Sequence, residues 1–169
     1  MAATYTLIDS YTVGSGGASS VTLGSGGTIP QTYTDLLVKI SAREATGGGW
    51  CGFMYFNNSN SNLQLRSIYG SGSNAYSQLR TDGLIGMNDS GSGSNIFSNS
   101  DIYIPNYTSS NYKSFSQDSV TEDNATLAYI LSGAMLWSST SAINRIDFIA
   151  YTGNIAQYST FYLYGIKNS

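Results

Sequence analysis

The chain has 169 residues, which fits one domain able to bury about two-thirds of its unfolded surface. Charged residues make up only 10%, the net charge is −3 and the seven basic residues form no run, which argues against a nucleic-acid partner. The lack of histidine excludes Ser-His-Asp and Cys-His catalysis. With one cysteine there is no internal disulfide and no plausible zinc site, so we expect a single domain over residues 1–169 with no metal or cofactor.

The alternation of apolar and polar residues predicts a succession of short strands. Alternation is clearest in residues 34–43, where Leu36, Val38, Ile40 and Ala42 face one way. Such a segment has one buried and one solvated face, as in an antiparallel sheet. The predicted strands lie within residues 5–13, 20–23, 34–43, 50–57, 63–69, 77–86, 101–120, 125–137, 143–151 and 160–166.

The opening strand has an interrupted apolar face. Tyr5, Leu7, Tyr11 and Val13 are spaced to fall on one side, and Asp9 breaks the set. We expect the four apolar residues to share one face of a continuous strand.

Three later segments carry more specific predictions. Residues 101–120 hold two alternating runs around a polar connection and predict a β-hairpin. Residues 77–86 predict one or two strands anchored by Leu79 and Ile85. Residues 125–137 have helical propensity, but a central glycine and the β-rich surroundings favour two short strands or one bent strand.

The number and spacing of these segments predict an all-β fold. About nine to eleven short strands, separated by small polar turns, fit an antiparallel β-sandwich. Eight or more strands in two packed sheets make a jelly-roll-like arrangement our prediction. The 14 tyrosines, six phenylalanines and two tryptophans supply the aromatic surface that such a core needs.

Acidic residues do not form a recognisable catalytic pair or calcium loop. Asp118, Glu122 and Asp123 are the only acidic cluster, and we interpret them as a solvated end of a strand rather than as the carboxylates of a glycosidase. Asp82 and Asp89 sit in glycine- and serine-rich stretches, which is typical of turns. No calcium-loop pattern accompanies them.

The N-terminus and Cys51 give weaker indications. Residues 1–13 lack the basic start and apolar run of a signal peptide, and no segment approaches the roughly 20 apolar residues that span a bilayer. We therefore expect synthesis in a cytoplasm and no membrane partner. Cys51 lies between Trp50 and Phe53, where we expect a small buried apolar residue rather than a reactive thiol.

Several segments resemble small virion structural proteins of tailed bacteriophages, particularly marine ones. The resemblance implies a jelly-roll-like fold, no catalysis and assembly with copies of the same chain, and it brings no active-site residue. It is carried by residues 5–23 (YTLIDSYTVGSGGASSVTL), 29–43 (IPQTYTDLLVKISAR), 102–126 (IYIPNYTSSNYKSFSQDSVTEDNAT), 136–148 (LWSSTSAINRIDF) and 158–169 (YSTFYLYGIKNS).

Two functions follow from the resemblance. The first is a capsid cement or decoration protein, made in the bacterial host, which binds the major capsid protein on the outer surface of the virion as a homotrimer. The alternative is a fibre-tip or receptor-binding domain that recognises host surface glycans through exposed tyrosine or tryptophan. A free carbohydrate-binding module of a secreted enzyme is a third possibility, which the missing signal peptide disfavours.

Contact residues are expected at ends and loops, because these carry binding in rigid β scaffolds. Aromatic side chains at such places bury a large area at low entropic cost. The predicted interface residues lie in the opening strand, the loop of the 101–120 hairpin and the last strand: Tyr5, Leu7, Tyr107, Tyr112, Tyr162 and Tyr164.

Overall fold

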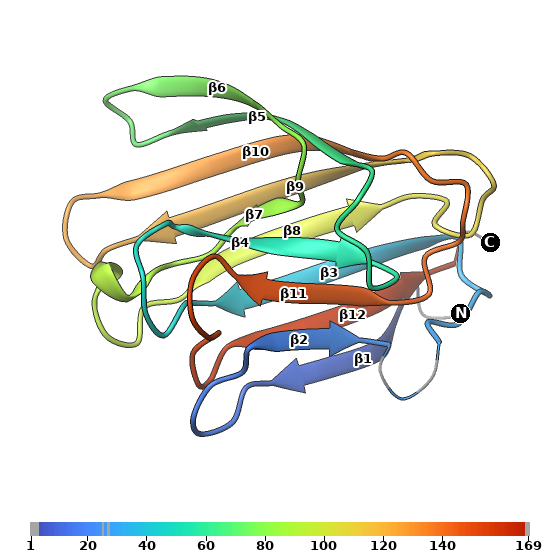
Figure 1. Ribbon diagram of the computed structural model, residues 1–169, viewed down its shortest axis with the longest axis horizontal. Coiled ribbons are helices and arrows are strands. Elements are labelled where there is room, and N and C mark those ends of the chain that lie inside the picture. The colour runs from blue at the N-terminus through green and yellow to red at the C-terminus, as the bar shows by residue number, and fades with distance from the viewer. Residues whose placement is uncertain (1–3, 25, 27, 168–169) are drawn as a thin grey trace.

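The computed structural model describes residues 4–24, 26 and 28–167, which form two antiparallel sheets packed face to face (Figure 1). The large sheet has eight strands, in the order β1 (Tyr5–Thr12), β12 (Thr160–Ile166), β3 (Asp35–Ala42), β8 (Ser98–Ile104), β9 (Lys113–Glu122), β10 (Ala128–Trp137), β5 (Leu63–Gly70) and β6 (Ala75–Arg80). The small sheet has four, in the order β2 (Ser20–Leu23), β11 (Ile146–Ala150), β4 (Cys51–Phe56) and β7 (Leu84–Gly86).

The connections confirm a jelly-roll arrangement. Without the inserted hairpins the two sheets have the orders β1-β12-β3-β8 and β2-β11-β4-β7, and the chain changes sheet at every step except from β4 to β7, as in a jelly roll. Two hairpins, β5–β6 and β9–β10, are inserted into this order and both join the large sheet. The described residues thus hold twelve strands, one more than the upper end of the predicted range, because residues 77–86 divide between β6 and β7 in different sheets.

The inserted hairpins extend the large sheet past the edge of the small one. Figure 1 shows β10, β5 and β6 continuing beyond β7, an edge strand of the small sheet, whereas β9 lies against β7. At one end of this extension Phe56 of β4 packs against Phe115 and Trp137, with ring centroids 5.3 Å apart in both pairs. The other end has no strand of the small sheet over it.

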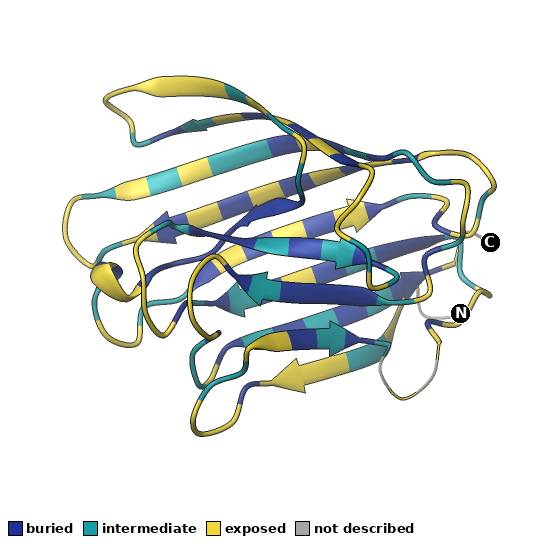
Figure 2. Ribbon diagram, viewed as in Figure 1, coloured by how far each residue is buried: buried dark blue, intermediate teal, exposed yellow. Residues whose placement is uncertain are grey.

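The core fills the space between the inner faces of the sheets. Leu36, Val38, Ile40 and Ala42 of β3 are all buried, which confirms the predicted alternation. Strand β9 alternates buried and exposed over its whole length, visible as bands in Figure 2. Among the described residues no helix is long and apolar enough to cross a membrane.

The predicted hairpin of residues 101–120 and the segment of residues 125–137 form regular strands. Strands β8 and β9 pair antiparallel, as predicted for residues 101–120. Strand β10 is one strand that pairs along its length with β9 and β5, rather than two short strands. Its Gly133 faces inward, where a Cβ would lie 2.8 Å from Leu65 Cδ1 and 3.0 Å from Gln117 Cγ, so only glycine lets these neighbours pack so closely.

Two details of the predicted strands are wrong. A bulge between Leu7 and Asp9 shifts the register of β1, so that Leu7 lies opposite Tyr164 whereas Tyr11 lies opposite Phe161 on the other face. The four apolar residues of the opening strand therefore do not share one face. Leu79 is not an anchor, since β6 is an edge strand and leaves it 63% exposed, while Ile85 is fully buried as predicted.

Side chains of the large sheet close the open edge of the small one. Strand β7 pairs only with β4, so its other edge presents unpaired backbone groups. Gln117 Nε2 donates to the carbonyl of Leu84 at 2.8 Å, and Ser100 Oγ donates to the carbonyl of Gly86 at 3.0 Å. These buried polar residues thus satisfy a strand edge that would otherwise need water.

Candidate binding site

A groove opens where the extension of the large sheet passes the edge of the small sheet. It has a volume of about 520 Å³, within the range of about 300–1,000 Å³ that is usual for small-ligand sites. Strands β9, β10, β5 and β6 form its floor, while β4, β7 and the segments before and after them form its wall. The chain alternation of the jelly roll brings these distant segments together.

Four aromatic side chains line the groove: Trp50, Tyr69, Tyr129 and Tyr151. The rings of Trp50 and Tyr129 meet edge to face, with centroids 4.3 Å apart and an interplanar angle of 89°. Trp50 has a φ of 53°, a left-handed backbone conformation that is rare for a bulky residue and that clusters at functional sites. The turn before β4 is therefore built to present this indole beside Tyr129.

Polar groups in the groove lack partners within the protein. Thr121 Oγ1 is buried and has no hydrogen-bond partner. Asp89 is only 3% exposed, and its Oδ1 accepts hydrogen bonds from Ser92 N at 2.9 Å and Ser92 Oγ at 3.0 Å. Its Oδ2 and the side-chain amide of Gln78 make no hydrogen bond to the residues that the structure describes. Asp89 Oδ2 and the Gln78 amide can therefore hydrogen-bond to a ligand, whereas the buried Thr121 Oγ1 is closed to one.

The charges around the groove leave no free cation among its described residues. Arg80 is the only basic side chain that lines it, and its Nε donates to both carboxylate oxygens of Asp82 at 2.9 and 3.1 Å. The hydrogen bond to Asp82 raises the pKa of Arg80 further. Burial raises the pKa of the Cys51 thiol to about 12, so this residue contributes a neutral surface, as its predicted role as a buried apolar residue requires.

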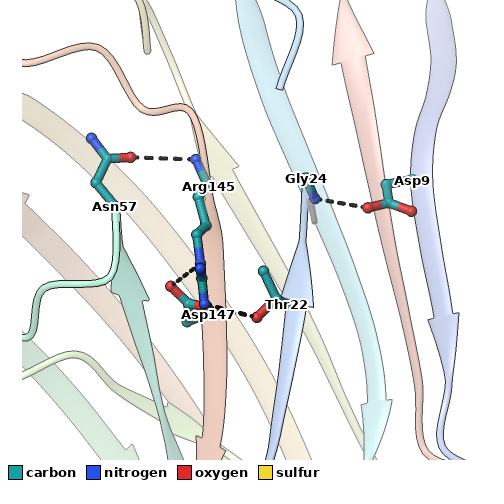
Figure 3. A network of polar contacts seen from close by, with 6 residues as sticks. All are labelled: Asp9, Thr22, Gly24, Asn57, Arg145 and Asp147. Atoms are coloured by element: carbon teal, nitrogen blue, oxygen red, sulfur yellow. Dashed lines mark hydrogen bonds and ion pairs between the residues drawn. The ribbon is translucent and has the colours of Figure 1, made fainter. Parts of the chain in front are cut away.

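A second polar cluster, on the other side of the small sheet, is internally paired (Figure 3). Arg145 Nε donates to Asp147 Oδ1 and Oδ2 at 2.7 and 3.0 Å, and Thr22 Oγ1 donates to Asp147 Oδ1 at 2.7 Å. Asn57 Oδ1 accepts from the backbone N–H of Arg145 at 3.3 Å, and its Nδ2 donates to a carbonyl at 2.8 Å. Because these groups form hydrogen bonds with one another, the cluster has a structural role and links β2, β11 and the end of β4.

The outer face of the large sheet, opposite the groove, carries exposed aliphatic side chains. Val120 and Ile130 are cross-strand partners on β9 and β10, and Ile68 and Leu79 continue the set diagonally on β5 and β6. Their exposed fractions are 50%, 59%, 65% and 63%, respectively. We call these four residues the aliphatic cluster. Contiguous exposed apolar groups of this kind mark interaction surfaces.

Four of the six predicted interface residues lie together on the same outer face, at its other end. Leu7 is the cross-strand partner of Tyr164, and Tyr162 stacks beside Tyr164 with ring centroids 6.5 Å apart. Tyr5 is two residues before Leu7 on the same side of β1 and is 56% exposed. The row continues through Leu37 to β8.

The hairpin loop places the two remaining predicted residues differently. Tyr112 is 60% exposed and can reach a partner. Tyr107 is completely buried, and its hydroxyl donates to the carbonyl of Pro30, so its prediction as an interface residue is wrong. The physical reason is that the loop folds back over the end of the sandwich, where the backbone of Ile143 also donates to the carbonyl of Tyr107 at 3.0 Å.

The acidic residues have structural roles. Asp118 accepts a hydrogen bond from Ser132 Oγ at 2.8 Å, and Asp123 Oδ1 accepts from the backbone N–H groups of Ala125 and Leu127 at the turn. Within residues 4–24, 26 and 28–167 no group of three or more Asp, Glu or Cys side chains is placed to hold a metal ion.

Sequence reasoning missed both the groove and the aliphatic cluster. The cluster could have been found from the alternation of the strands. Val120 lies on the same side of its strand as the polar residues Ser116 and Asp118, and Ile68 lies on the same side as Arg66. An aliphatic residue at a position that is otherwise polar is a signal of contact. The groove had no such signal, because its lining joins segments that are far apart in the chain, such as those of Trp50, Tyr129 and Tyr151.

Comparison with known proteins adds no assignment: neither a protein-family model, nor a curated protein, nor a solved structure matches this chain. Its surfaces are therefore interpreted from their own geometry.

Proposed function

We propose that this chain is a non-enzymatic structural protein of a tailed-bacteriophage particle, which assembles as a homotrimer and binds the outside of the capsid as a cement protein. The observation that carries the proposal is the aliphatic cluster of Ile68, Leu79, Val120 and Ile130, each at least half exposed. The jelly-roll topology and the resemblance of segments such as residues 102–126 to virion structural proteins support it.

The aliphatic cluster provides a driving force for association. Burying a whole Val, Leu or Ile side chain contributes about 1.5–3 kcal/mol, and about half of each side chain in the cluster is still accessible. Each would add about 1 kcal/mol on contact with a partner. That is too little for a strong single contact, but sufficient for many copies attached to a repeating lattice, because multivalent attachment multiplies weak contacts.

The large sheet also ends in two open edges. Strand β1 pairs only with β12, and β6 pairs only with β5. Such edges offer unpaired backbone groups to another chain, and proteins usually protect them. The exposed Leu79 on β6 and Leu7 on β1 leave these edges apolar, which favours contact with a neighbouring copy or with the shell.

A protein that binds only the assembled shell, and not its free subunits, stabilises that shell by mass action. The test compares particles with and without the protein. We expect particles from a phage lacking the gene to release their DNA at a lower temperature and to adsorb normally, and added purified protein to restore their stability. Heads that are sound but unable to adsorb would instead identify a receptor-binding domain and overturn the proposal.

Substitution on the aliphatic cluster locates the contact. Ile68→Lys combined with Leu79→Lys places two charges at its most exposed positions, and we expect this variant to fold but not to restore particle stability. Ser114→Lys is the matched control, since Ser114 is exposed on the same face at the opposite end of β9. Equal restoration by both variants would show that the aliphatic cluster is not the contact.

A further inference from the structure

We propose that the groove between the extension of the large sheet and strand β7 binds a neutral carbohydrate. This inference is argued separately from capsid binding, because Ile68, Leu79 and Val120 of the aliphatic cluster lie outside the lining of the groove and Ile130 alone belongs to both. Three properties of the groove point to the same ligand class: its aromatic walls, its unpartnered hydrogen-bonding groups and its charge.

The aromatic walls fit the face of a sugar ring. A pyranose presents C–H groups on its faces and hydroxyls around its rim, so it packs flat against an aromatic side chain and offers hydrogen bonds at the edge. Trp50 and Tyr129 are held at right angles to each other, and Tyr69 and Tyr151 line the same groove. Tyrosine and tryptophan suit this task because they combine an apolar body with a polar end.

The hydrogen-bonding groups complement a polyhydroxylated ligand. Asp89 Oδ2 can only accept a hydrogen bond, and the Gln78 amide can both donate and accept. Asp89 Oδ2 and the Gln78 amide make no hydrogen bond to the described residues, and unlike Thr121 Oγ1 they are not closed off from the groove by burial. By contrast, the polar groups around Arg145 in Figure 3 are all used in the fold.

The charge of the groove selects against anions. Arg80 is the one cation among the described residues of the lining, and its Nε already donates to both carboxylate oxygens of Asp82. Asp89 also lines the groove, and its Oδ2 accepts no hydrogen bond from the described residues. A phosphate, sulfate or sialic acid would meet this negative charge without a free cation to balance it, whereas a sugar hydroxyl can donate to it.

The other ligand classes fit less well. A fatty acyl chain would leave Gln78 and Asp89 unsatisfied. A nucleotide has a ring that stacks but also carries phosphate. An extended peptide would pair with a free strand edge, and the edge of β7 at this point is already capped by Gln117 and Ser100.

Titration of the purified full chain with neutral hexaoses tests the inference. The probes are maltohexaose, cellohexaose, laminarihexaose and chitohexaose, with sialyllactose as an anionic comparison, and heat release is measured by calorimetry. We expect at least one neutral probe to bind with a Kd tighter than about 1 mM and sialyllactose to bind more weakly. Failure of every neutral probe, or a preference for sialyllactose, would overturn the proposal.

Two variants locate the site. Gln78→Met keeps an unbranched side chain of similar length and removes only the unpartnered amide that lines the groove, so we expect nearly unchanged thermal stability together with about tenfold weaker sugar binding. Tyr129→Ala removes the ring that packs against Trp50, with at least a similar loss expected. Tyr112→Ala is the control, because it removes an exposed tyrosine outside the groove.

Two results with these variants would contradict the proposed location of the site. Unchanged affinity in Gln78→Met would show that the sugar binds elsewhere, even if Tyr129→Ala failed to fold. Loss of binding in Tyr112→Ala would place the site on the hairpin loop instead. Because these titrations use the isolated chain, they remain informative if the capsid experiment fails, and the capsid experiment remains informative if no sugar binds.

Discussion

Lys113 provides the sharpest test of how this sandwich is held together. It is a buried lysine, 1% exposed, at the start of β9. Its Nζ donates to the carbonyls of Ser109, Ser139 and Ser141 at 2.7, 3.2 and 2.5 Å, so it joins the loop before β9 to the loop after β10. Three acceptors require three N–H groups, which only the ammonium form has.

The size of the effect follows from two opposing contributions. Each hydrogen bond to a charged group contributes about 1.5–3 kcal/mol, and removing the side chain leaves three carbonyls without a donor. Burial also lowers the pKa of the Lys113 amine, which shows that desolvation of the charge costs part of this gain. We therefore expect Lys113→Met to reduce the free energy of unfolding by about 2–4 kcal/mol.

Urea denaturation followed by tryptophan fluorescence measures this change. With a slope of about 1–3 kcal/mol per molar urea, the midpoint should fall by about 1–2 M. The matched control is Lys39→Met, because Lys39 is paired with Asp101 at 2.6 Å but both side chains are about half exposed. That exposed pair should contribute less than about 1 kcal/mol. An unchanged or higher midpoint for Lys113→Met would show that desolvation outweighs the three hydrogen bonds.

Two further predictions concern buried titratable groups. Burial raises the pKa of the Cys51 thiol to about 12, so the fraction of thiolate at pH 8 is about 10⁻⁴. Iodoacetamide reacts with the thiolate, so it should modify the folded protein at least about a hundredfold more slowly than the urea-unfolded protein. Similar rates of modification would contradict this prediction. Glu44 is fully buried, and desolvation raises its pKa above 4.5, so the stability present below pH 4.5 is partly lost as pH rises through the raised pKa. Glu44→Gln removes the ionisation, so its melting temperature relative to the natural chain should increase from about pH 4 to about pH 8, whereas a constant difference would refute the assignment.

The strands and their inward faces were determined by the sequence. Side chains alternate with a period of two along a strand, so a local pattern such as that of residues 34–43 reveals both the strand and the buried set. The hairpin of β8 and β9 was predictable for the same reason, because its two halves are close along the chain. The all-β class and the role of Cys51 followed from these patterns and from composition.

The contacts that strands and loops make with one another were decided only by the tertiary structure. The bulge that turns Tyr11 away from Leu7 arises from the pairing of β1 with β12, strands at opposite ends of the chain. The burial of Tyr107 depends on a loop folding back onto Pro30. The groove depends on where two hairpins join the large sheet, so Trp50 and Tyr129 meet although they are far apart in sequence. A period of two fixes which way a side chain points, but strand pairing determines what it meets there.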